Sequence, residues 1–405
     1  MKITVFFLWV LLLCVRADAQ VTSFVVQTGE DKVFNHQPVY ADFDAGQVDV
    51  QSPLCLVSGG HDTPGQIERL ADGKVRLWWI VDIPDGGSRT YDLYTDQNCN
   101  SAGNFYWERV REDATLLRFG NKPVIQYEHP VYNPDDIEST KKPYHHVFDP
   151  AGWGLITKGL GGLYPHHRGI YFGYYLYTGE NRIEKAENDE DRIDIWHARN
   201  GERSEHSKIL REFAGPVMGG HVLEILWKDR DGSELVREVR EIRVFNQPNG
   251  ETMIDFKTNL TASAGPIKLA GDRQHAGVQF RAAQYVADNP EATRYIRPES
   301  VSHLSPVTEI GGDEMYDLPW NAMQFTIGER TYTTTYFTHP DNPEGAEMSE
   351  RLYGRFGEYI PHHLTNNNPL NLNYRFWITK GEASSLADIN ARHGAYMSPA
   401  KVTVR

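Results

Sequence analysis

The sequence has few cysteines, and its basic residues are outnumbered by acidic ones. Its 405 residues include three Cys, and 41 Lys and Arg stand against 55 Asp and Glu, which gives a formal net charge of −14. Such a charge repels polyanions, so we expect no nucleic-acid partner. Beyond the N-terminal leader only Cys55 and Cys99 remain. Two thiols are too few to form a structural zinc site unaided.

Long hydrophobic runs are also absent, except at the N-terminus. Residues 3–15 are apolar, follow Lys2 and precede the small-x-small sequence of residues 17–19, which predicts a secretory signal peptide over residues 1–19. The run is short for a membrane span, so we expect no membrane insertion of the mature chain and a periplasmic or secreted location. A disulfide between Cys55 and Cys99 fits such an oxidising compartment.

Helical periodicity is scarce, and its best example is the short segment SLADINARHGAYM near the C-terminus. The chain is rich in residues of strands and turns, with 21 Tyr, 17 Phe, 9 Trp, 35 Gly and 22 Pro. Alternating segments flank the turn candidates at residues 86–87, 120–121 and 247–250. These patterns predict an all-β protein. We expect a small N-terminal β-sandwich over residues 20–112 and a large antiparallel β supersandwich over residues 113–405.

Histidines are unevenly distributed, because four of the 16 fall between residues 145 and 167. Polar and aromatic side chains gather in four segments: Tyr144, His145 and His146; Tyr164, His166, His167 and Arg168; Asp194, Trp196, His197 and His206; Asp272, Arg273, His275, Gln279 and Arg281. On a strand, neighbouring histidines would point to opposite faces, whereas in a glycine-flanked loop both could converge. Taken singly, each histidine is more often structural than functional.

Histidine titrates near neutral pH and suits proton transfer, while arginine can hold a carboxylate. We therefore predict the catalytic residues His167, His166, Tyr164 and His275. The predicted substrate-binding residues are Arg168, Arg281, His146, His206 and Trp196.

Metal-binding motifs of defined spacing are missing, so we predict no metal ligands and no cofactor. The sequence leaves open a zinc ion bound by histidines from separate strands. It leaves open a bound calcium ion as well. The acidic segment of residues 184–191 lacks the spacing of a calcium loop and is expected to be a solvated surface loop. Carboxylate pairs for glycoside hydrolysis cannot be chosen from spacing; the candidates are Asp149, Glu180, Asp194, Glu205, Asp272 and Glu358.

The series PYHHVFDPAG, YPHHRGIYFGYY, DIWH, HAGVQFRA, THPDNP and YGRFG resembles the bacterial family described as methane oxygenase PmoA-like. The N-terminal stretch GQIERLADGKVRLWWIVDIPDGGSRTYDLY resembles the small β domain that often precedes it. Methane oxygenation is not expected, because the chain lacks membrane-spanning helices after its leader. Members look like exported proteins of polysaccharide-degrading bacteria, similar in fold to galactose mutarotase-like and polysaccharide lyase proteins. The resemblance implies that one concave face gathers His146, His166, His167, Arg168, His206, His275 and Arg281.

These observations favour a carbohydrate-active enzyme that performs acid/base β-elimination, as a lyase or dehydratase, on uronate-containing oligosaccharides. His167 would be the base, Tyr164 or His275 the acid, and Arg168 with Arg281 the carboxylate clamp. A glycoside hydrolase using Asp or Glu is the nearest alternative. A non-catalytic glycan-binding protein and an epimerase remain further alternatives.

Overall fold

Almost all regular structure in the chain is β, which confirms the predicted fold class. The computed structural model describes residues 20–29, 32–44, 46, 53–70, 73–95, 99, 103–179, 192–307 and 315–405. The predicted signal peptide and the acidic segment of residues 184–191 lie outside these residues. Within them, none of the helices has the length and apolar character that crossing a membrane requires.

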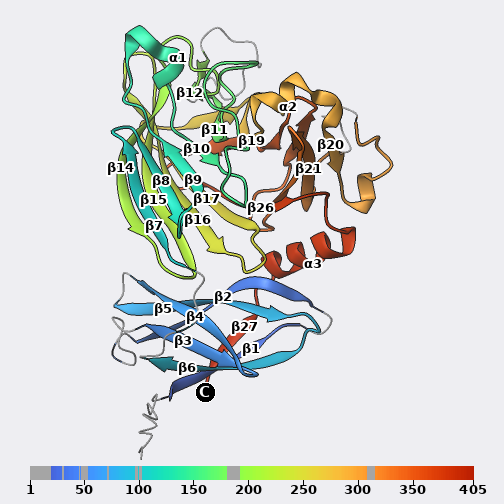
Figure 1. The fold of residues 1–405 in the computed structure, drawn as a ribbon. Helices are drawn as coiled ribbons and strands as arrows, with labels where there is room; N and C mark the ends of the chain where they lie inside the picture. Colours follow the sequence, from blue (N-terminus) through green and yellow to red (C-terminus); the bar gives the residue numbers. More distant parts are fainter. Residues whose placement is uncertain are drawn as a thin grey trace, which may run out of the picture.

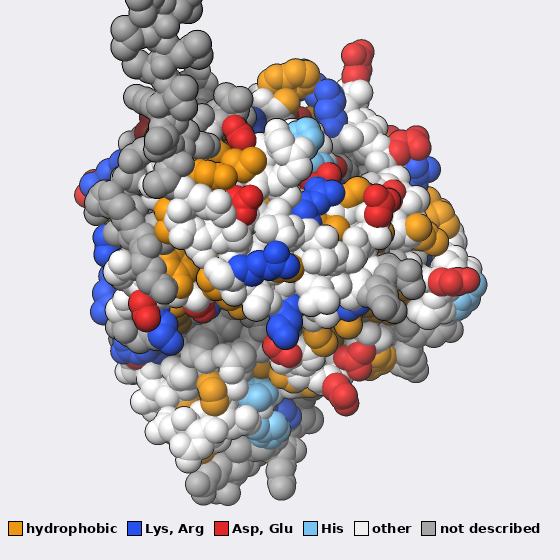
Figure 2. Space-filling model, turned by 90° about the horizontal axis from the view of Figure 1, so that it is seen from below, with side chains coloured by type: hydrophobic (Ala, Val, Ile, Leu, Met, Phe, Trp, Pro, Cys, Tyr) orange, Lys and Arg blue, Asp and Glu red, His pale blue; other side chains and the backbone are white. Residues whose placement is uncertain are grey.

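The N-terminal unit is one curled antiparallel sheet of seven strands in the order β2-β5-β4-β3-β6-β1-β27 (Figure 1). Its strands are β1 (Gln20–Gln27), β2 (Phe34–Asp44), β3 (Leu54–Ser58), β4 (His61–Arg69), β5 (Lys74–Ile83), β6 (Ser88–Thr95) and β27 (Lys401–Val404). Phe24, Trp79 and Leu93 are fully buried in its core. A disulfide joins Cys55 to Cys99. Figure 2 shows basic and acidic side chains interspersed over the described part of the face that is seen from below.

The predicted domain boundary at residue 112 assigns two strands to the wrong unit. Strand β7 (Phe105–Arg111) pairs with β8 (Ala114–Phe119) and so belongs to the larger unit. Strand β27, close to the C-terminus, pairs with β1 in the N-terminal sheet. Sequence position misassigns both strands because hydrogen bonding joins segments that lie far apart in the chain.

The larger unit packs two eight-stranded sheets against each other (Figure 1). One sheet has the order β23-β24-β19-β11-β10-β9-β8-β7, and the other has the order β14-β15-β16-β17-β26-β22-β21-β20. The further strands of the first sheet are β9 (Lys122–Glu128), β10 (Tyr144–Val147), β11 (Ile170–Gly173), β19 (Gly277–Arg281), β23 (Glu347–Arg351) and β24 (Arg355–Tyr359). Those of the second are β14 (Arg203–Phe213), β15 (Met218–Lys228), β16 (Glu234–Asn246), β17 (Thr252–Ala262), β20 (Arg294–Ile296), β21 (Trp320–Ile327), β22 (Arg330–Thr338) and β26 (Leu370–Lys380).

A four-stranded sheet and a few short helices complete the larger unit. The small sheet consists of β13 (Ile193–Asp194), β12 (Tyr175–Thr178), β18 (Ile267–Ala270) and β25 (His362–Leu364). The α-helices are α1 (Ile137–Thr140), α2 (Gln284–Asp288) and α3 (Leu386–Met397), and the 3-10 helices are η2 (Pro134–Asp136), η4 (Pro290–Ala292) and η5 (Glu299–Val301). Helix α3 confirms the predicted C-terminal helix, and β8–β9 and β16–β17 confirm two predicted hairpins.

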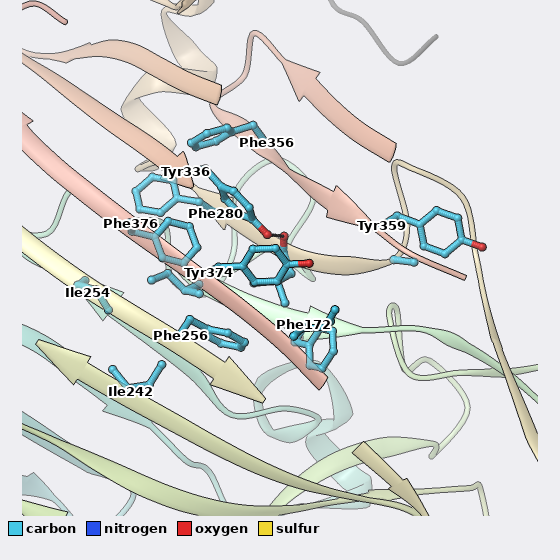
Figure 3. Close-up of a cluster of buried hydrophobic side chains, with 14 of the residues drawn as sticks. Phe172, Ile242, Ile254, Phe256, Phe280, Tyr336, Phe356, Tyr359, Tyr374 and Phe376 are labelled. Atoms are coloured by element: carbon cyan, nitrogen blue, oxygen red, sulfur yellow. Dashed lines mark hydrogen bonds between the residues drawn. The ribbon is translucent and has the colours of Figure 1, made fainter. Parts of the chain in front are cut away.

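Aromatic side chains fill the space between the two large sheets (Figure 3). Phe256 and Phe376 come from the second sheet, and Phe172, Phe280 and Phe356 come from the first. All are nearly or fully buried. The Phe280 ring centroid lies 6.0 Å from that of Phe356 and 6.1 Å from that of Phe376, so it bridges the two sheets. Apolar burial on this scale is the main source of stability for the fold.

The two units are joined by a buried ion pair. Both guanidinium Nη atoms of Arg243 on β16 donate to the Glu68 carboxylate on β4, at 2.8 and 3.1 Å. The Trp78 indole nitrogen donates to the same carboxylate at 2.7 Å. Burial would raise the pKa of Glu68, but hydrogen bonds and charge from Arg243, together with Trp78 and Arg211, lower it to about 2.

Replacing Glu68 by glutamine should destabilise the protein, because Arg243 would lose its buried counter-charge. We expect a loss of about 3 kcal/mol of unfolding free energy at pH 7, measured by chemical denaturation. The depressed pKa makes this stabilisation present above pH 4.5 and lost as the pH falls toward 2, so the difference from the wild type should shrink there. Asp42→Asn is the control, because its pair with Arg76 is partly exposed and should contribute below about 1 kcal/mol.

Glu358 on β24 generates a second stability prediction. Its side chain accepts a hydrogen bond from the Thr338 hydroxyl, its Oε2 has no partner among the described residues, and burial raises its pKa to about 8 from 4.5. As the pH rises, the unfolded chain loses this proton near pH 4.5, whereas the folded chain keeps it up to about pH 8. The free energy of unfolding should therefore fall between pH 4.5 and 8 by about 1.4 kcal/mol per pH unit. Glu358→Gln should remove that decline. Denaturation at pH 4.5 and 8 tests this, and an unchanged slope would contradict it; exposed Glu299→Gln is the control.

Candidate functional site

Side-chain alternation gives the first large sheet two different faces around β11, β19 and β24. Ile170, Phe172, Val278, Phe280 and Phe356 belong to the core between the sheets. Since neighbouring residues of a strand point to opposite faces, the intervening residues face away from that core. These intervening residues are Tyr171, Gln279, Arg281 and Arg355, and all are fully buried beneath loops. The outer face therefore carries a polar and cationic layer under a protein cover.

The loop ahead of β11 brings two adjacent histidines together. Tyr164 and Gly169 both have positive φ angles, 52° and 55°, and a Cβ at residue 169 would lie 2.0 Å from the His145 carbonyl oxygen. Glycine is therefore required there. His166 and His167 lie in a loop and not in a strand, so both side chains can converge, as one of the two predicted alternatives had it. Their ring centroids are 4.2 Å apart.

Two further histidines are held by the same local arrangement. The ring Nδ1 of His197 lies 2.8 Å from Asp194, whose carboxylate also accepts the backbone N–H of His197. The ring Nδ1 of His275 lies 3.0 Å from Asp272, whose carboxylate again accepts the histidine backbone N–H. A carboxylate at Nδ1 favours the tautomer whose Nε2 lone pair can accept a proton.

These loops enclose a pocket of about 340 Å³. Its lining residues are Tyr164, His166, His167, His197, Arg199, Gln274, His275, Arg351 and Tyr353. All four predicted catalytic residues are among them. The His197 ring centroid lies 4.5 Å from that of His166 and 5.2 Å from that of His275, so the imidazoles form a continuous row. No carboxylate belongs to this lining among the described residues.

Three predicted substrate-binding residues lie behind the pocket instead of in its wall. Arg168 points to helix α1, where its Nη2 donates to the Glu138 carboxylate at 2.8 Å. Arg281 donates to the carbonyl oxygens of Ala282 and Tyr353. Trp196 is fully buried, with its ring centroid 4.9 Å from that of Tyr171, so it has no free face for a sugar ring. None of the three lines the pocket, although Arg168 Nη1 and Arg281 Nε and Nη2 are buried without a partner among the described residues. That these residues bind substrate stays a prediction.

The other two predicted substrate-binding residues, His146 and His206, are hydrogen-bonded to other side chains. His146 on β10 is buried, and its Nδ1 lies 3.0 Å from the Thr157 hydroxyl. His206 on β14 belongs to the second large sheet, and its Nδ1 lies 3.1 Å from the Tyr127 hydroxyl. Neither lines the pocket. That they bind substrate stays a prediction, because clustering along the chain did not reveal which residues line the pocket.

Burial controls the protonation of His166, His167 and His197. Burial, followed by nearby positive groups, lowers the pKa of His166 and that of His167 below the ordinary range. Burial also lowers the pKa of His197, against the opposing effect of Asp194. These imidazoles are consequently neutral at neutral pH. Both ring nitrogens of His167 are buried without a hydrogen-bond partner in the described part of the chain, so this residue lies at the back of the pocket.

Behind the row, buried basic side chains donate hydrogen bonds to neutral groups. Lys142 donates to the Trp196 carbonyl, and Lys158 donates to the carbonyls of Gly159, Tyr164 and His167. Arg355 donates to Tyr353, Gln279 and Ser349. Burial, then the charges of Arg281 and Arg168, lowers the pKa of Lys158 to about 7.

Buried arginines elsewhere in the larger unit have carboxylate partners, as in Arg240–Glu238, Arg297–Glu350 and Arg375–Asp255. Within the described ranges, Lys142, Lys158 and Arg355 hydrogen-bond to no carboxylate. The region behind the pocket therefore holds basic side chains without carboxylate partners among the described residues. Burial, then the charges of Lys141 and Arg168, lowers the pKa of Lys142 well below its usual value.

Metal coordination is not supported by the geometry of the described residues. Within the described ranges, no group of three or more His, Cys, Asp or Glu is arranged to hold a metal ion. The pocket histidines instead pack ring against ring, with interplanar angles of 72° and 52° for the pairs His166–His167 and His166–His197.

The sequence matches the model of a family of unknown function, DUF6807, over residues 114–393. The chain belongs to this family. The matched region starts at β8, ends within α3 and contains every lining residue of the histidine pocket. No curated protein matches the chain. Likeness to the PmoA-like, mutarotase-like and polysaccharide lyase families therefore stays a prediction for this family member.

Several pocket residues were not among the predicted site residues. They are His197, Arg199, Gln274, Arg351 and Tyr353. A signal for two of the histidines was present, since DIWH and DRQH both place an aspartate three residues before a histidine. The arrangement at Asp194 and Asp272 gives that shared spacing a structural meaning. Arg351 and Tyr353 had no comparable local signal, because only strand pairing brings their turn to the pocket.

Replacing His167 by phenylalanine should make the protein less sensitive to acid. A histidine with a lowered pKa stays neutral in the folded chain while the unfolded chain takes up a proton, so stability declines as the pH falls below 6.5. Each such histidine contributes up to about 1.4 kcal/mol per pH unit. In chemical denaturation below pH 6.5, the unfolding free energy of the variant should therefore decline less steeply with falling pH than that of the wild type, by up to this amount. Gln274→Ala is the control, and equal slopes for His167→Phe and the wild type would contradict the expectation.

Proposed function

We propose that the protein is an exported enzyme that cleaves or dehydrates uronate-containing oligosaccharides by acid/base β-elimination in the histidine pocket. The observation that carries the proposal is a pocket lined by histidines, tyrosines and arginines, with no carboxylate in the described lining and none bonded to the buried Arg355 behind it among the described residues. An anionic substrate would supply the missing negative charge. The disulfide between Cys55 and Cys99 is consistent with export to an oxidising compartment.

In this reaction, His197 takes the proton from the carbon next to the uronate carboxylate. Its Nδ1 is held by Asp194 and its lowered pKa keeps the ring neutral, so Nε2 is available as a base. The electron pair of the broken C–H bond forms a carbon–carbon double bond, and the bond from the neighbouring carbon to its oxygen substituent breaks. His275, held by Asp272 and less buried, donates a proton to the departing oxygen. No water is consumed.

Two arginines and two tyrosines complete the proposed site. Arg199 and Arg351 line the pocket and replace Arg168 and Arg281 as the groups that neutralise the substrate carboxylate and the charge that develops beside it. Tyr164 and Tyr353, with ring centroids 4.9 Å apart, offer aromatic surface to a sugar ring at the same wall. His167 lies behind them and supports the row by packing against Tyr171, at 5.4 Å between ring centroids.

Glycoside hydrolysis is less well supported at this pocket. It needs two carboxyl groups across the scissile bond, and the carboxylates closest to the row, Asp194 and Asp272, already bind histidines.

The proposal is tested by incubating the mature protein with uronate oligosaccharides and with matched neutral ones. Mass spectrometry should show cleavage without water uptake, or loss of water, only for the uronates, together with ultraviolet absorbance from a conjugated product. His197→Gln and His275→Gln should each lower kcat by about 10²- to 10⁴-fold, because each removes one proton-transfer group. Activity should fall on the acid side only below pH 6.5, because the pKa of His197 is lowered.

Asp149→Asn is the matched control, since this buried aspartate lies outside the pocket lining. A product that has gained water would overturn elimination in favour of hydrolysis. Full activity of both histidine variants would remove the assigned acid and base.

A further inference from the structure

A larger cavity lies between the N-terminal unit and the sandwich. Its volume is about 830 Å³, and it shares no lining residue with the histidine pocket. The N-terminal unit contributes the ends of β2, β3 and β5, and the sandwich contributes the turn between β16 and β17. In Figure 1 the N-terminal unit lies below the sandwich, while β11 and β12 lie toward its upper end. A volume of this size is ample for a small-molecule ligand.

Two polar side chains that line the cavity have buried atoms without partners among the described residues. Gln247, in the β16–β17 turn, is 5% exposed and donates through Nε2 to the carbonyl oxygens of His36 and Asn246, at 3.2 and 3.3 Å. Its Oε1 accepts no hydrogen bond from these residues, and His36 Nδ1 across the interface is also buried without a partner. A buried polar atom without a partner is unfavourable, so a rotation of either side chain that turned this atom toward the cavity and a polar ligand group would be favoured.

The backbone at His36 is also unusual. His36 has a φ of 50°, a left-handed conformation that is uncommon for a residue other than glycine. The pairing of β2 with β5 is irregular between Phe34 and Gln37, so His36 lies in a bulge. Bulges redirect side chains and often lie next to binding sites, and strained backbone is retained where it positions a functional group.

The remaining lining favours a ligand without net charge. The acidic residues Asp62 and Asp82 are balanced by the basic residues Arg89 and Lys122. Ile80, Phe119 and Pro248 add apolar surface. Hydroxyl groups both donate and accept hydrogen bonds, and the C–H face of a sugar ring packs on an aromatic side chain. This combination of polar atoms, apolar surface and balanced charge suits a neutral saccharide better than an anion.

We propose that this cavity is a second binding site, which takes a neutral oligosaccharide and holds it between His36 and Gln247. The proposal does not depend on the chemistry assigned to the histidine pocket, because the two sites share no residue. Binding here would attach the protein to a neutral part of a polysaccharide while the histidine pocket acts on another part.

Calorimetric titration of the full mature chain with neutral trisaccharides built from glucose, mannose, galactose and xylose tests the proposal. We expect at least one to bind with one-to-one stoichiometry, equally well to the wild type and to His275→Gln. Gln247→Leu should weaken binding by about tenfold or more, because it removes the amide at similar volume. Ser58→Trp should do the same by filling the cavity, while it retains the Gln247 contact with His36.

Ser58→Trp tests the cavity independently, because Gln247→Leu also removes the Gln247 contact with His36 across the interface. Thermal unfolding checks that both variants remain folded. Absence of binding by every trisaccharide would overturn the proposal. Unchanged binding in both cavity variants, or loss of binding in His275→Gln alone, would overturn it as well. None of these results depends on whether the histidine pocket catalyses elimination.

Discussion

Alternation of side chains along β11, β19 and β24 is the constraint on which the candidate site depends. Because neighbouring residues point to opposite faces, Phe172 and Phe280 enter the core while Tyr171 and Arg281 face the other way. The same strands therefore stabilise the sandwich and supply the layer behind the histidine pocket, where Tyr171 packs against His167. Loops then only need to place imidazoles over a layer that the packed sheet already holds rigid, which is the arrangement that acid/base chemistry requires.

Buried basic side chains have different partners at the interface between the two units and behind the histidine pocket. Arg243 and Arg375 are buried against Glu68 and Asp255, and these pairs lie where the N-terminal unit meets the sandwich. Behind the histidine pocket, by contrast, Lys142 and Arg355 are buried against neutral groups. A protein interior normally pairs its charges, and the proposal of an anionic substrate rests on this difference in the partners of the buried basic side chains.

The two proposed sites divide between the part of the chain that the family model covers and the part that extends beyond it. Every residue of the histidine pocket lies within the matched region of residues 114–393. The interface cavity needs the N-terminal unit, which contributes His36, and the sandwich, which contributes Gln247. Catalysis would thus belong to the sandwich, while neutral-sugar binding would require both units together. Strand β27 strengthens that union, because the chain returns to pair with β1 after completing the sandwich.

The sequence by itself determined the features that depend on local pattern. Period-two alternation and Asn-Gly or Gly-Asn turns predicted the strands and hairpins, the short periodic segment predicted α3, and histidine clustering led to Tyr164, His166, His167 and His275. Only the tertiary structure decided which side chains meet. Arg168 and His206 were indistinguishable from pocket residues in the sequence, yet one pairs with Glu138 and the other lies on the opposite sheet. The physical reason is that strand pairing joins residues distant in the chain, and the face to which a side chain points depends on a register that no local pattern encodes.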